Sequence, residues 1–311
     1  MPTHSKFLAY LQLFRLSNVF TAVADVAMGF LLTHNMQQFE PSPALLAAFG
    51  MVVAASVLLY MAGMVLNDVF DAEVDARERP ERPIPSGRVS WNFARLLGLE
   101  MLLIGVALGF AASFFVGDVR PGLVASALAV CVLLYDSWAK KGPLGPVVMG
   151  SCRFFNALLG MSLAAFTWSA GNWVVATGLG VYVAGVTWFA RTEARDSSRV
   201  QLALATLVMG LGLALLWWFP AWSEWIIAPP NNWLFFWVVI GLLIGWRCVR
   251  AILAPTPAHV QTAVKQSILS LIVLDAAVAY AAQGPQGALW AFAILLLLIP
   301  TMFLGRWVYS T

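Results

Sequence analysis

Ten long apolar stretches, separated by short polar segments, are the feature that most limits the fold of this chain. Of its 311 residues, 61% are hydrophobic and 11% are charged, with a mean hydropathy of +0.81, whereas soluble domains carry about 25% charged residues. A helix of about 20 apolar residues crosses a bilayer. We therefore predict an all-α, polytopic membrane bundle of nine to ten spans that forms one domain over residues 1–311. The predicted spans cover residues 12–33, 43–66, 92–115, 121–136, 144–166, 172–190, 200–219, 232–253, 264–282 and 286–306.

The basic residues gather on one side of the membrane when successive loops are assigned alternately, beginning with the N-terminus. That side receives Lys6, Arg77, Arg79, Arg82, Arg88, Lys140, Lys141, Arg191, Arg195, Arg199, Lys265 and Arg306. The opposite loops receive Arg120 alone. Because cytoplasmic loops carry an excess of Lys and Arg, we predict a multi-pass protein of the cell membrane with both termini in the cytoplasm. The loops after spans two, four and six then all lie on the cytoplasmic side, where we expect them to form a polar cap over one shared cavity.

A carboxylate cluster ends the second apolar run, in the sequence NDVFDAEVD at residues 67–75. On a helix, Asp68, Asp71 and Asp75 fall within about 60° of one another, and Asn67 lies on the same side. Oxygen ligands packed this tightly favour a cation among them, and oxygen-only sites suit Mg²⁺, which proteins often hold through a few carboxylates and the phosphates of a substrate. We therefore predict that these four residues bind Mg²⁺ and a diphosphate at the membrane edge.

The loop that follows carries two arginines among three prolines. Pro80, Pro83 and Pro85 cannot continue a helix, so the chain must turn over the predicted cavity. Arg79 and Arg82 have the planar, forked geometry that binds diphosphate oxygens. The alternative is a solvated loop whose arginines only follow the charge rule for cytoplasmic loops.

These two segments together resemble a known signature. Residues 67–75, followed by RPIPSG at residues 82–87, resemble the N-D-x-x-D-x-x-x-D and R-P-I-P-S-G motifs of the UbiA superfamily of membrane prenyltransferases. The resemblance implies a bundle of nine spans around a cavity that opens to the membrane, with two Asp-rich motifs that hold Mg²⁺ and an isoprenyl diphosphate. The tenth run, 286–306, would be an addition to that fold.

Residues 135–140, YDSWAK, resemble the family's Y-x-x-x-K-type element after the fourth span. By that resemblance, Lys140 contacts the diphosphate and Tyr135 lines the donor site. Residues 142–156 and 185–193 look most similar to the EboC-like bacterial branch of the superfamily.

The second acidic motif departs from the family pattern. Typical members read Y-A-x-x-D-x-x-D-D, whereas residues 189–197 read FARTEARDS. Glu193 and Asp196 lie three residues apart on one helix face, and we predict that they hold a second Mg²⁺. Arg191 and Arg195 beside them are an alternative, since their charge could neutralise the diphosphate directly. A further alternative is a surface cluster of paired charges.

Several charges fall inside predicted spans, where each costs at least about 2.5–3.5 kcal/mol. They are Asp25, Glu100, Arg153, Arg247, Arg250 and Asp275. We predict that Arg153 and Asn156 reach the substrate from span five, with Asn18 contributing from span one. Asp275 would orient an acceptor hydroxyl or pair with an arginine. The alternative for each is an internal structural pair.

The predicted function is Mg²⁺-dependent transfer of an isoprenyl group from a polyisoprenyl diphosphate to a small or lipid acceptor within the bilayer, with no nucleic-acid partner. The predicted catalytic residues are Asp68, Asp71, Asp75, Tyr135 and Lys140. The predicted substrate contacts are Asn18, Asn67, Arg79, Arg82, Lys140, Arg153, Asn156 and Arg195.

Two functions from other classes stay open. One is a non-catalytic prenyl-lipid binder or scaffold that kept the first acidic motif and lost the second. The other is a small-molecule transporter with Asp25 and Asp275 on an ion path, which predicts internal repeats with broken helices. The hydropathy of the chain shows no such repeat.

Overall fold

The computed structural model describes residues 6–40, 42–191, 197–223, 226, 231–284 and 287–306. Within these ranges the regular structure is helical. The helices are α1 (Lys6–Leu13), α2 (Leu16–Thr33), α3 (Pro43–Phe70), α4 (Ala72–Glu78), α5 (Trp91–Val116), α6 (Arg120–Ser137), η1 (Ala139–Lys141), α7 (Gly145–Met161), α8 (Ala170–Ala190), α9 (Arg199–Trp218), η2 (Phe219–Trp222), α10 (Trp233–Leu253), α11 (Pro257–Ala282), α12 (Gly287–Leu295) and α13 (Leu298–Leu304).

The predicted bundle of nine to ten spans is confirmed. In the described ranges, nine helical segments are long and apolar enough to cross a bilayer. The fifth predicted span corresponds to α7, which has 17 residues and packs between α2, α6 and α8. It ends at Met161, whose carbonyl accepts a hydrogen bond from the Trp168 indole at 3.1 Å, rather than at the predicted residue 166.

Two predicted span starts were wrong. The ninth span begins at Pro257 and not at residue 264. The first span does not begin at residue 12, because Arg15 adopts a left-handed conformation with φ of 42° that separates α1 from α2. The last predicted run, 286–306, is observed as one candidate span over Gly287–Leu304, with a break between α12 and α13. Pro300 explains the second break, because it has no N–H to donate to the carbonyl of residue 296.

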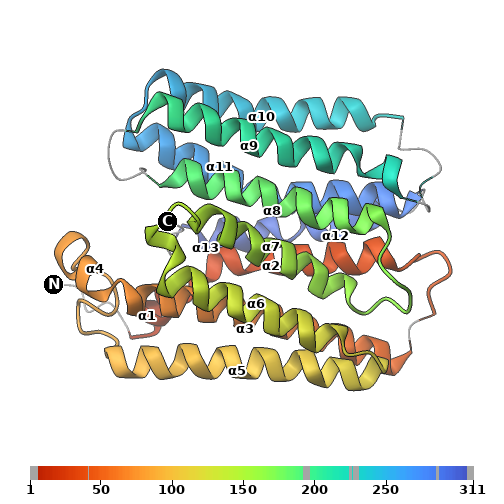
Figure 1. The fold of residues 1–311 in the computed structure, drawn as a ribbon, viewed down its shortest axis with the longest axis horizontal. Helices are drawn as coiled ribbons and strands as arrows, with labels where there is room; N and C mark the ends of the chain where they lie inside the picture. Colours follow the sequence, from red (N-terminus) through yellow and green to blue (C-terminus); the bar gives the residue numbers. More distant parts are fainter. Residues whose placement is uncertain are drawn as a thin grey trace.

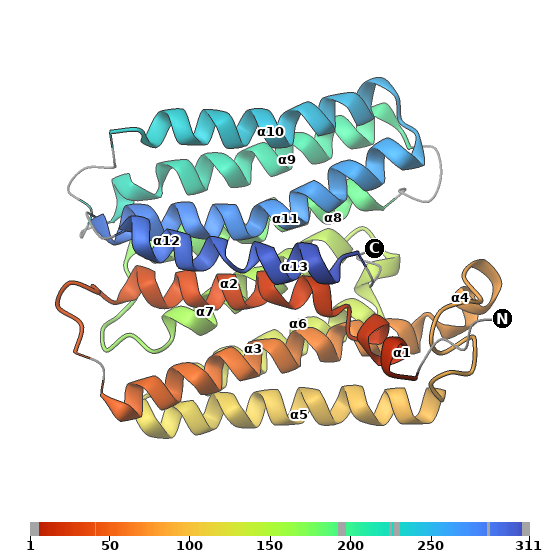
Figure 2. The ribbon, with the colours of Figure 1, turned by 180° about the vertical axis from the view of Figure 1, so that it is seen from behind.

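Figures 1 and 2 show the long helices running roughly side by side along the molecule. Helices α2 and α7 lie in the middle, α3, α5 and α6 lie on one side, and α8 to α11 lie on the other. Helix α2 contacts α3, α7, α11 and α13. It is therefore the element around which the bundle is assembled.

Small residues allow α2 and α7 to approach closely. A Cβ added to Gly160 would collide with the Val26 carbonyl, and one added to Gly29 would collide with the Ala157 carbonyl. Glycine at such crossings lets helix backbones pack together inside a membrane. This close packing sets the polar residues of α7 directly against those of α2.

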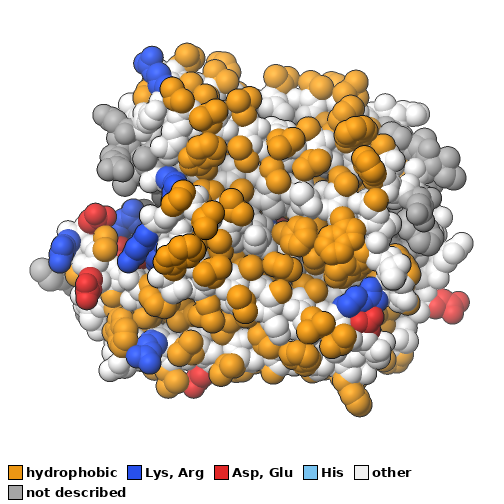
Figure 3. All heavy atoms as spheres, in the orientation of Figure 1, with side chains coloured by type: hydrophobic (Ala, Val, Ile, Leu, Met, Phe, Trp, Pro, Cys, Tyr) orange, Lys and Arg blue, Asp and Glu red, His pale blue; other side chains and the backbone are white. Residues whose placement is uncertain are grey.

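Apolar side chains cover the outside of the bundle. Leu103 and Phe114 on α5 and Leu242 on α10 are 71%, 86% and 66% exposed. Figure 3 shows such side chains over most of the visible face, whereas Lys and Arg gather mainly at the end of the molecule that carries α4. This distribution suits a protein whose sides face lipid and whose α4 end faces water.

Arg120, the basic residue predicted on the opposite side, belongs to a local ion pair. Its Nη2 lies 2.6 Å from Asp118 Oδ2, and its Nη1 donates a hydrogen bond to the Phe166 carbonyl at 2.8 Å. The side-chain hydrogen bond from Arg120 to Asp118 lowers the pKa of the Asp118 carboxyl group. Arg120 therefore connects the loop at Asp118 to the loop at Phe166. It does not alter the predicted excess of basic residues on the other side of the membrane.

The described ends of the chain lie at the same end of the bundle as α4, as Figures 1 and 2 show for α1 and α13. Gly305, just after α13, approaches the Ser17 side chain at the start of α2. This arrangement agrees with an even number of crossings. That the shared side is the cytoplasm stays a prediction.

We expect thiol labelling in sealed vesicles to separate the two ends of the bundle. In a variant whose three cysteines are replaced by alanine, Ser86→Cys and Lys141→Cys should react with an impermeant maleimide from one side. Val119→Cys, at the opposite end, should react only from the other side, as measured by the gel shift of a maleimide polymer. Equal access to positions 86 and 119 from one side would contradict the topology.

Candidate functional site

A cavity of about 640 Å³ lies between the central helices. At the α4 end its lining is charged and polar, with Arg15, Asn67, Asp71, Asp75, Arg79, Arg82, Lys140, Lys141 and Arg191. Farther along the helices its walls are largely apolar, with Leu59, Leu128, Val132, Val183, Val186, Ile268 and Leu271. The cavity therefore joins a polar, multiply charged end to an apolar interior.

The acidic motif keeps its helical spacing across a break. Helix α3 ends at Phe70 and α4 begins at Ala72, with Asp71 between them. The Asp71 amide still donates to the Asn67 carbonyl at 3.0 Å, and the Asp75 amide donates to the Asp71 carbonyl at 2.8 Å. Because these bonds continue the helical pattern, Asp71 and Asp75 both line the cavity. Glu73, by contrast, is exposed and does not line the cavity.

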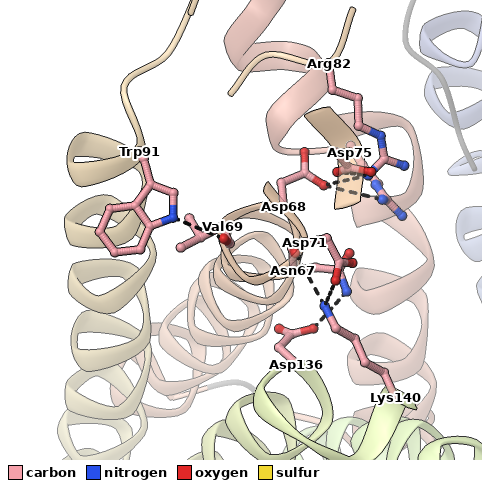
Figure 4. Close-up of polar contacts among 10 residues, drawn as sticks. Asn67, Asp68, Val69, Asp71, Asp75, Arg82, Trp91, Asp136 and Lys140 are labelled. Atoms are coloured by element: carbon pink, nitrogen blue, oxygen red, sulfur yellow. Dashed lines mark hydrogen bonds and ion pairs between the residues drawn. The ribbon is translucent and has the colours of Figure 1, made fainter. Parts of the chain in front are cut away.

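Arg82 binds two of the carboxylates at once, as Figure 4 shows. Its Nη1 lies 2.7 Å from Asp75 Oδ2 and 3.4 Å from Asp68 Oδ1. Arg15 Nη2 also approaches Asp68 Oδ1, at 3.6 Å. Both carboxylates are buried. Their mutual repulsion is therefore offset by cations from the chain itself.

Lys140 binds the third carboxylate from the other side of the cavity. Its Nζ lies 2.8 Å from Asp71 Oδ1 and 3.5 Å from the Asn67 carbonyl oxygen. The Asn67 amide donates to Asp136 Oδ1 at 3.0 Å. These contacts, also visible in Figure 4, join the end of α3 to α6 and η1. Tyr135 lines the same cavity.

The proline-rich loop that carries Arg82 folds back on the bundle, as predicted. Ile84 is buried in a small apolar cluster beside α1, α3 and α5. Arg88 donates to Gln12 Oε1 at 3.0 Å, and the Trp91 indole donates to the Val69 carbonyl at 3.1 Å. These contacts hold the loop over the polar end of the cavity, so that Arg82 is positioned by packing.

A second polar cluster lies deep in the bundle, where α2, α3 and α7 meet. Arg153 Nη1 binds Asp25 Oδ2 at 2.8 Å, and Arg153 Nη2 donates to Thr21 Oγ1 at 2.6 Å. Asn156 donates to Asp25 Oδ2 at 2.8 Å and accepts a hydrogen bond from Ser56 at 2.6 Å. The predicted alternative of internal structural pairs is thus observed, although Arg153 and Asn156, like Asn18, also line the cavity.

Comparison with known proteins adds the decisive observation. A model of the UbiA prenyltransferase family matches residues 22–269. The chain belongs to this family. The match includes the first acidic motif, the arginine loop and the predicted site of the second motif, so the resemblance inferred from residues 67–87 is confirmed.

Relatives and solved UbiA structures agree with this assignment. A digeranylgeranylglyceryl phosphate synthase from Methanopyrus kandleri is 37% identical over 166 residues, which cover 51% of this chain and 56% of the relative. The chain spans about half the length of the curated relatives it matches. These relatives are archaeal, and the narrower EboC-like assignment stays a prediction.

Two solved structures share the fold. A UbiA homologue from Aeropyrum pernix K1 has a TM-score of 0.64 and 19% identity, covering 83% of this chain and 96% of that one. A UbiA homologue from Archaeoglobus fulgidus, bound to GPP and Mg²⁺, has a TM-score of 0.60 and 12% identity, covering 93% and 99%. At these identities the likeness establishes the helical architecture alone.

Some site residues of this UbiA protein were missed in the sequence. Arg15 was placed inside an apolar run, but the chain turn there brings it to Asp68. Asp136 belongs to the YDSWAK element, but the sequence assigns it no role, and in the structure it accepts a hydrogen bond from the Asn67 side-chain amide. The signal available in the sequence is Arg15 itself, a charged residue inside the predicted span 12–33 and three residues before Asn18.

The second acidic motif is described only at its start. Arg191 lines the cavity and donates to the Gly142 carbonyl, next to the Lys140 segment. Glu193, Arg195 and Asp196 lie outside the described residues. Their predicted roles therefore stay predictions.

The first motif has donors that suit Mg²⁺, but they are engaged by cations of the chain. Among the described residues, no three His, Cys, Asp or Glu side chains lie close enough together to hold a metal ion. Instead, Lys140 contacts Asp71, and Arg82 lies between Asp68 and Asp75. All the donors are oxygens, which is the chemistry that Mg²⁺ prefers, and Asn67, Asp71 and Asp75 line the end of one cavity. The donor set therefore fits once these two cations release it.

We expect Arg82→Gln to destabilise the protein by about 1–3 kcal/mol, because a buried carboxylate pair loses its charged hydrogen-bond donor. Added MgCl₂ should raise the melting temperature of this variant more than that of the unaltered protein, since Asp68 and Asp75 are then free to bind a cation. Melting in detergent with and without MgCl₂ measures both effects. Arg77→Gln, an exposed change on α4, is the control, and an equal response of both variants to MgCl₂ would refute the prediction.

Proposed function

We propose that this chain transfers an isoprenyl group from an isoprenyl diphosphate to an acceptor within the membrane, as an enzyme. The observation that carries the proposal is the set of carboxylates and cations at the polar end of a cavity whose walls are apolar. A diphosphate with an isoprenoid tail has the same division between a charged and an apolar end. Membership of the UbiA family supports the same reaction.

The cations at the polar end would bind the diphosphate. The planar guanidinium groups of Arg79 and Arg82 are suited to donate bidentate hydrogen bonds to its oxygens. Lys140 adds a point charge from the opposite side. In this role Arg82 and Lys140 exchange their carboxylate partners for phosphate oxygens. Asp68, Asp71 and Asp75, together with Asn67, would then hold Mg²⁺, which supplies positive charge to the leaving diphosphate.

The remainder of the cavity would hold the tail and protect the reacting carbon. Breaking the bond to the diphosphate develops positive charge on an allylic carbon, which water would capture as the free alcohol. Apolar walls such as Leu59, Val132 and Val186 keep water away. The rings of Tyr60 and Tyr135 line the cavity and offer faces that stabilise a cation.

The acceptor is proposed from the relatives. Those matched over about half their length are synthases of digeranylgeranylglyceryl phosphate. A lipid built on glyceryl phosphate is therefore the first acceptor to test.

We expect Asp71→Asn to weaken Mg²⁺-dependent binding of GPP by about 10- to 100-fold, because a charged ligand group is lost. The fold should be retained, since Asp71 lines the cavity and is only partly buried. Titration calorimetry with and without EDTA measures the affinity. Glu73→Gln, an exposed carboxylate two residues away, is the matched control.

The outcomes separate the candidate functions. If the affinity for GPP changes neither on addition of EDTA nor in the Asp71→Asn variant, the proposed metal site is wrong. Mg²⁺-dependent binding without release of diphosphate, in the presence of acceptor, would favour the non-catalytic binder.

A further prediction tests the altered second motif. If Glu193 and Asp196 hold a second Mg²⁺, Glu193→Gln should lower turnover by about 10²–10³-fold, the typical loss for one electrostatic group at a developing charge, and Glu193→Asp should not. If Arg191 and Arg195 supply the charge instead, Arg195→Ala should be the damaging change. Diphosphate release measures turnover. Unchanged rates in all three variants would show that this segment takes no part.

A further inference from the structure

A smaller pocket, of about 210 Å³, lies beside the main cavity. Its lining comes from the start of α2, from α11 and from the end of α13, and Figure 2 shows α13 between α11 and α2. Asn18 on α2 and Ile268 on α11 line both spaces. The pocket and the cavity therefore share a wall.

Two cations line this pocket without an acid beside them. They are Lys265 on α11 and Arg306 just after α13, and both side chains are exposed. The ion pairs among the described residues involve other cations, and the described lining of the pocket includes no Asp or Glu. A phosphate monoester carries about −1.5 to −2 elementary charges at pH 7. One such group would balance the charge of both cations.

The rest of the pocket suits the head group of a lipid. Ile268, Leu269 and Met302 contribute apolar side chains to the lining. Ile299 and Phe303, on the same helix as Met302, are 64% and 59% exposed on the outside of the bundle. Pockets that enclose a whole ligand usually have about 300–1,000 Å³. A space of 210 Å³ therefore accommodates a head group, while the apolar chain of the ligand stays along the outside of α11 and α13.

The pocket also lies close to the charged end of the main cavity. Asn18 comes three residues, or about one helical turn, after Arg15, and Arg15 Nη2 lies 3.6 Å from Asp68 Oδ1. In a lipid built on glyceryl phosphate, the free hydroxyl is only a few bonds from the phosphate. A phosphate in the pocket therefore leaves that hydroxyl near the wall that Asn18 shares with the cavity.

We infer that Lys265 and Arg306 bind the phosphate of the acceptor, and that the acceptor is a lipid phosphate monoester with a free hydroxyl. The inference rests on the proposed function, since it assigns the acceptor side of that reaction. Donor and acceptor then use separate cations, because Arg82 and Lys140 serve the diphosphate at the end of the main cavity. This separation reduces the repulsion between two anions in one site.

The first experiment measures lipid binding without any donor. We expect the unaltered protein to bind monooleoylglyceryl phosphate at least about tenfold more tightly than monooleoylglycerol, because charged hydrogen bonds to the phosphate are added. In Lys265→Gln/Arg306→Gln this preference should fall by about tenfold or more. In Lys265→Arg/Arg306→Lys, which keeps both charges, it should persist. Titration of the detergent-solubilised protein, followed by native mass spectrometry, measures the affinities.

Two controls accompany this titration. Arg77→Gln/Arg250→Gln removes the same charge from two exposed residues outside the pocket, and it should retain the preference. Inorganic phosphate, which has no apolar chain, should not displace the lipid at equal concentration. Displacement by inorganic phosphate would show a site for the free anion and overturn the assignment to a lipid.

The second experiment measures turnover with GPP, Mg²⁺ and monooleoylglyceryl phosphate. In Lys265→Gln/Arg306→Gln the KM for the acceptor should rise about tenfold or more, while kcat and the affinity for GPP stay within about threefold. This combination is expected when a contact binds the ground state and the transition state equally. A fall in kcat with an unchanged KM for the acceptor would contradict the assignment.

The results separate this inference from the proposed function. If diphosphate is not released from GPP with phosphorylated or unphosphorylated acceptors, the proposed function is wrong, whatever the lipid titration shows. If diphosphate is released but the double glutamine variant keeps the preference for the phosphorylated lipid, the phosphate site alone is wrong. Equal loss of the preference in the control variant would show a general effect of charge and also overturn the site.

Discussion

Charges inside a bilayer-spanning bundle must be compensated by charges from other helices, and this constraint organises the whole structure. Arg82 lies between Asp68 and Asp75, and Lys140 reaches Asp71 from the far side of the cavity. Deeper in the bundle, Arg153 of α7 holds Asp25 of α2. Taking one partner away from such a pair leaves a desolvated charge, which costs far more than a surface pair is worth. The helices are therefore tied at two levels.

The two levels depend on how closely the central helices pack. Gly29 and Gly160 allow α2 and α7 to approach until Arg153 and Asn156 face Asp25. At the polar end, the break at Arg15 turns the chain so that its guanidinium reaches Asp68. Helix α2 and Arg15, the residue just before it, thus supply partners to both clusters. These contacts set the separation of the helices, and the cavity is the space that remains between the two clusters.

The internal pairing of the acidic motif also bears on function. In the proposed reaction, Arg82 and Lys140 must exchange carboxylate partners for phosphate oxygens, which frees the carboxylates for Mg²⁺. Binding of donor and metal would then be mutually dependent, because each relieves the charge that the other leaves behind. Such coupling would disfavour a half-filled site exposed to water.

The sequence by itself determined the helical membrane class, the polar end with its basic loops, and the motif at residues 67–87, because hydropathy and local spacing act over one or two helix turns. It also indicated that Asp25, Arg153 and Asp275 face the interior, since lipid does not tolerate such charges. The tertiary structure alone decided which charges pair, that Arg15 joins the site, and that Arg153 of α7 holds Asp25 of α2. Those partners lie on helices far apart in the chain, and only packing determines their distances.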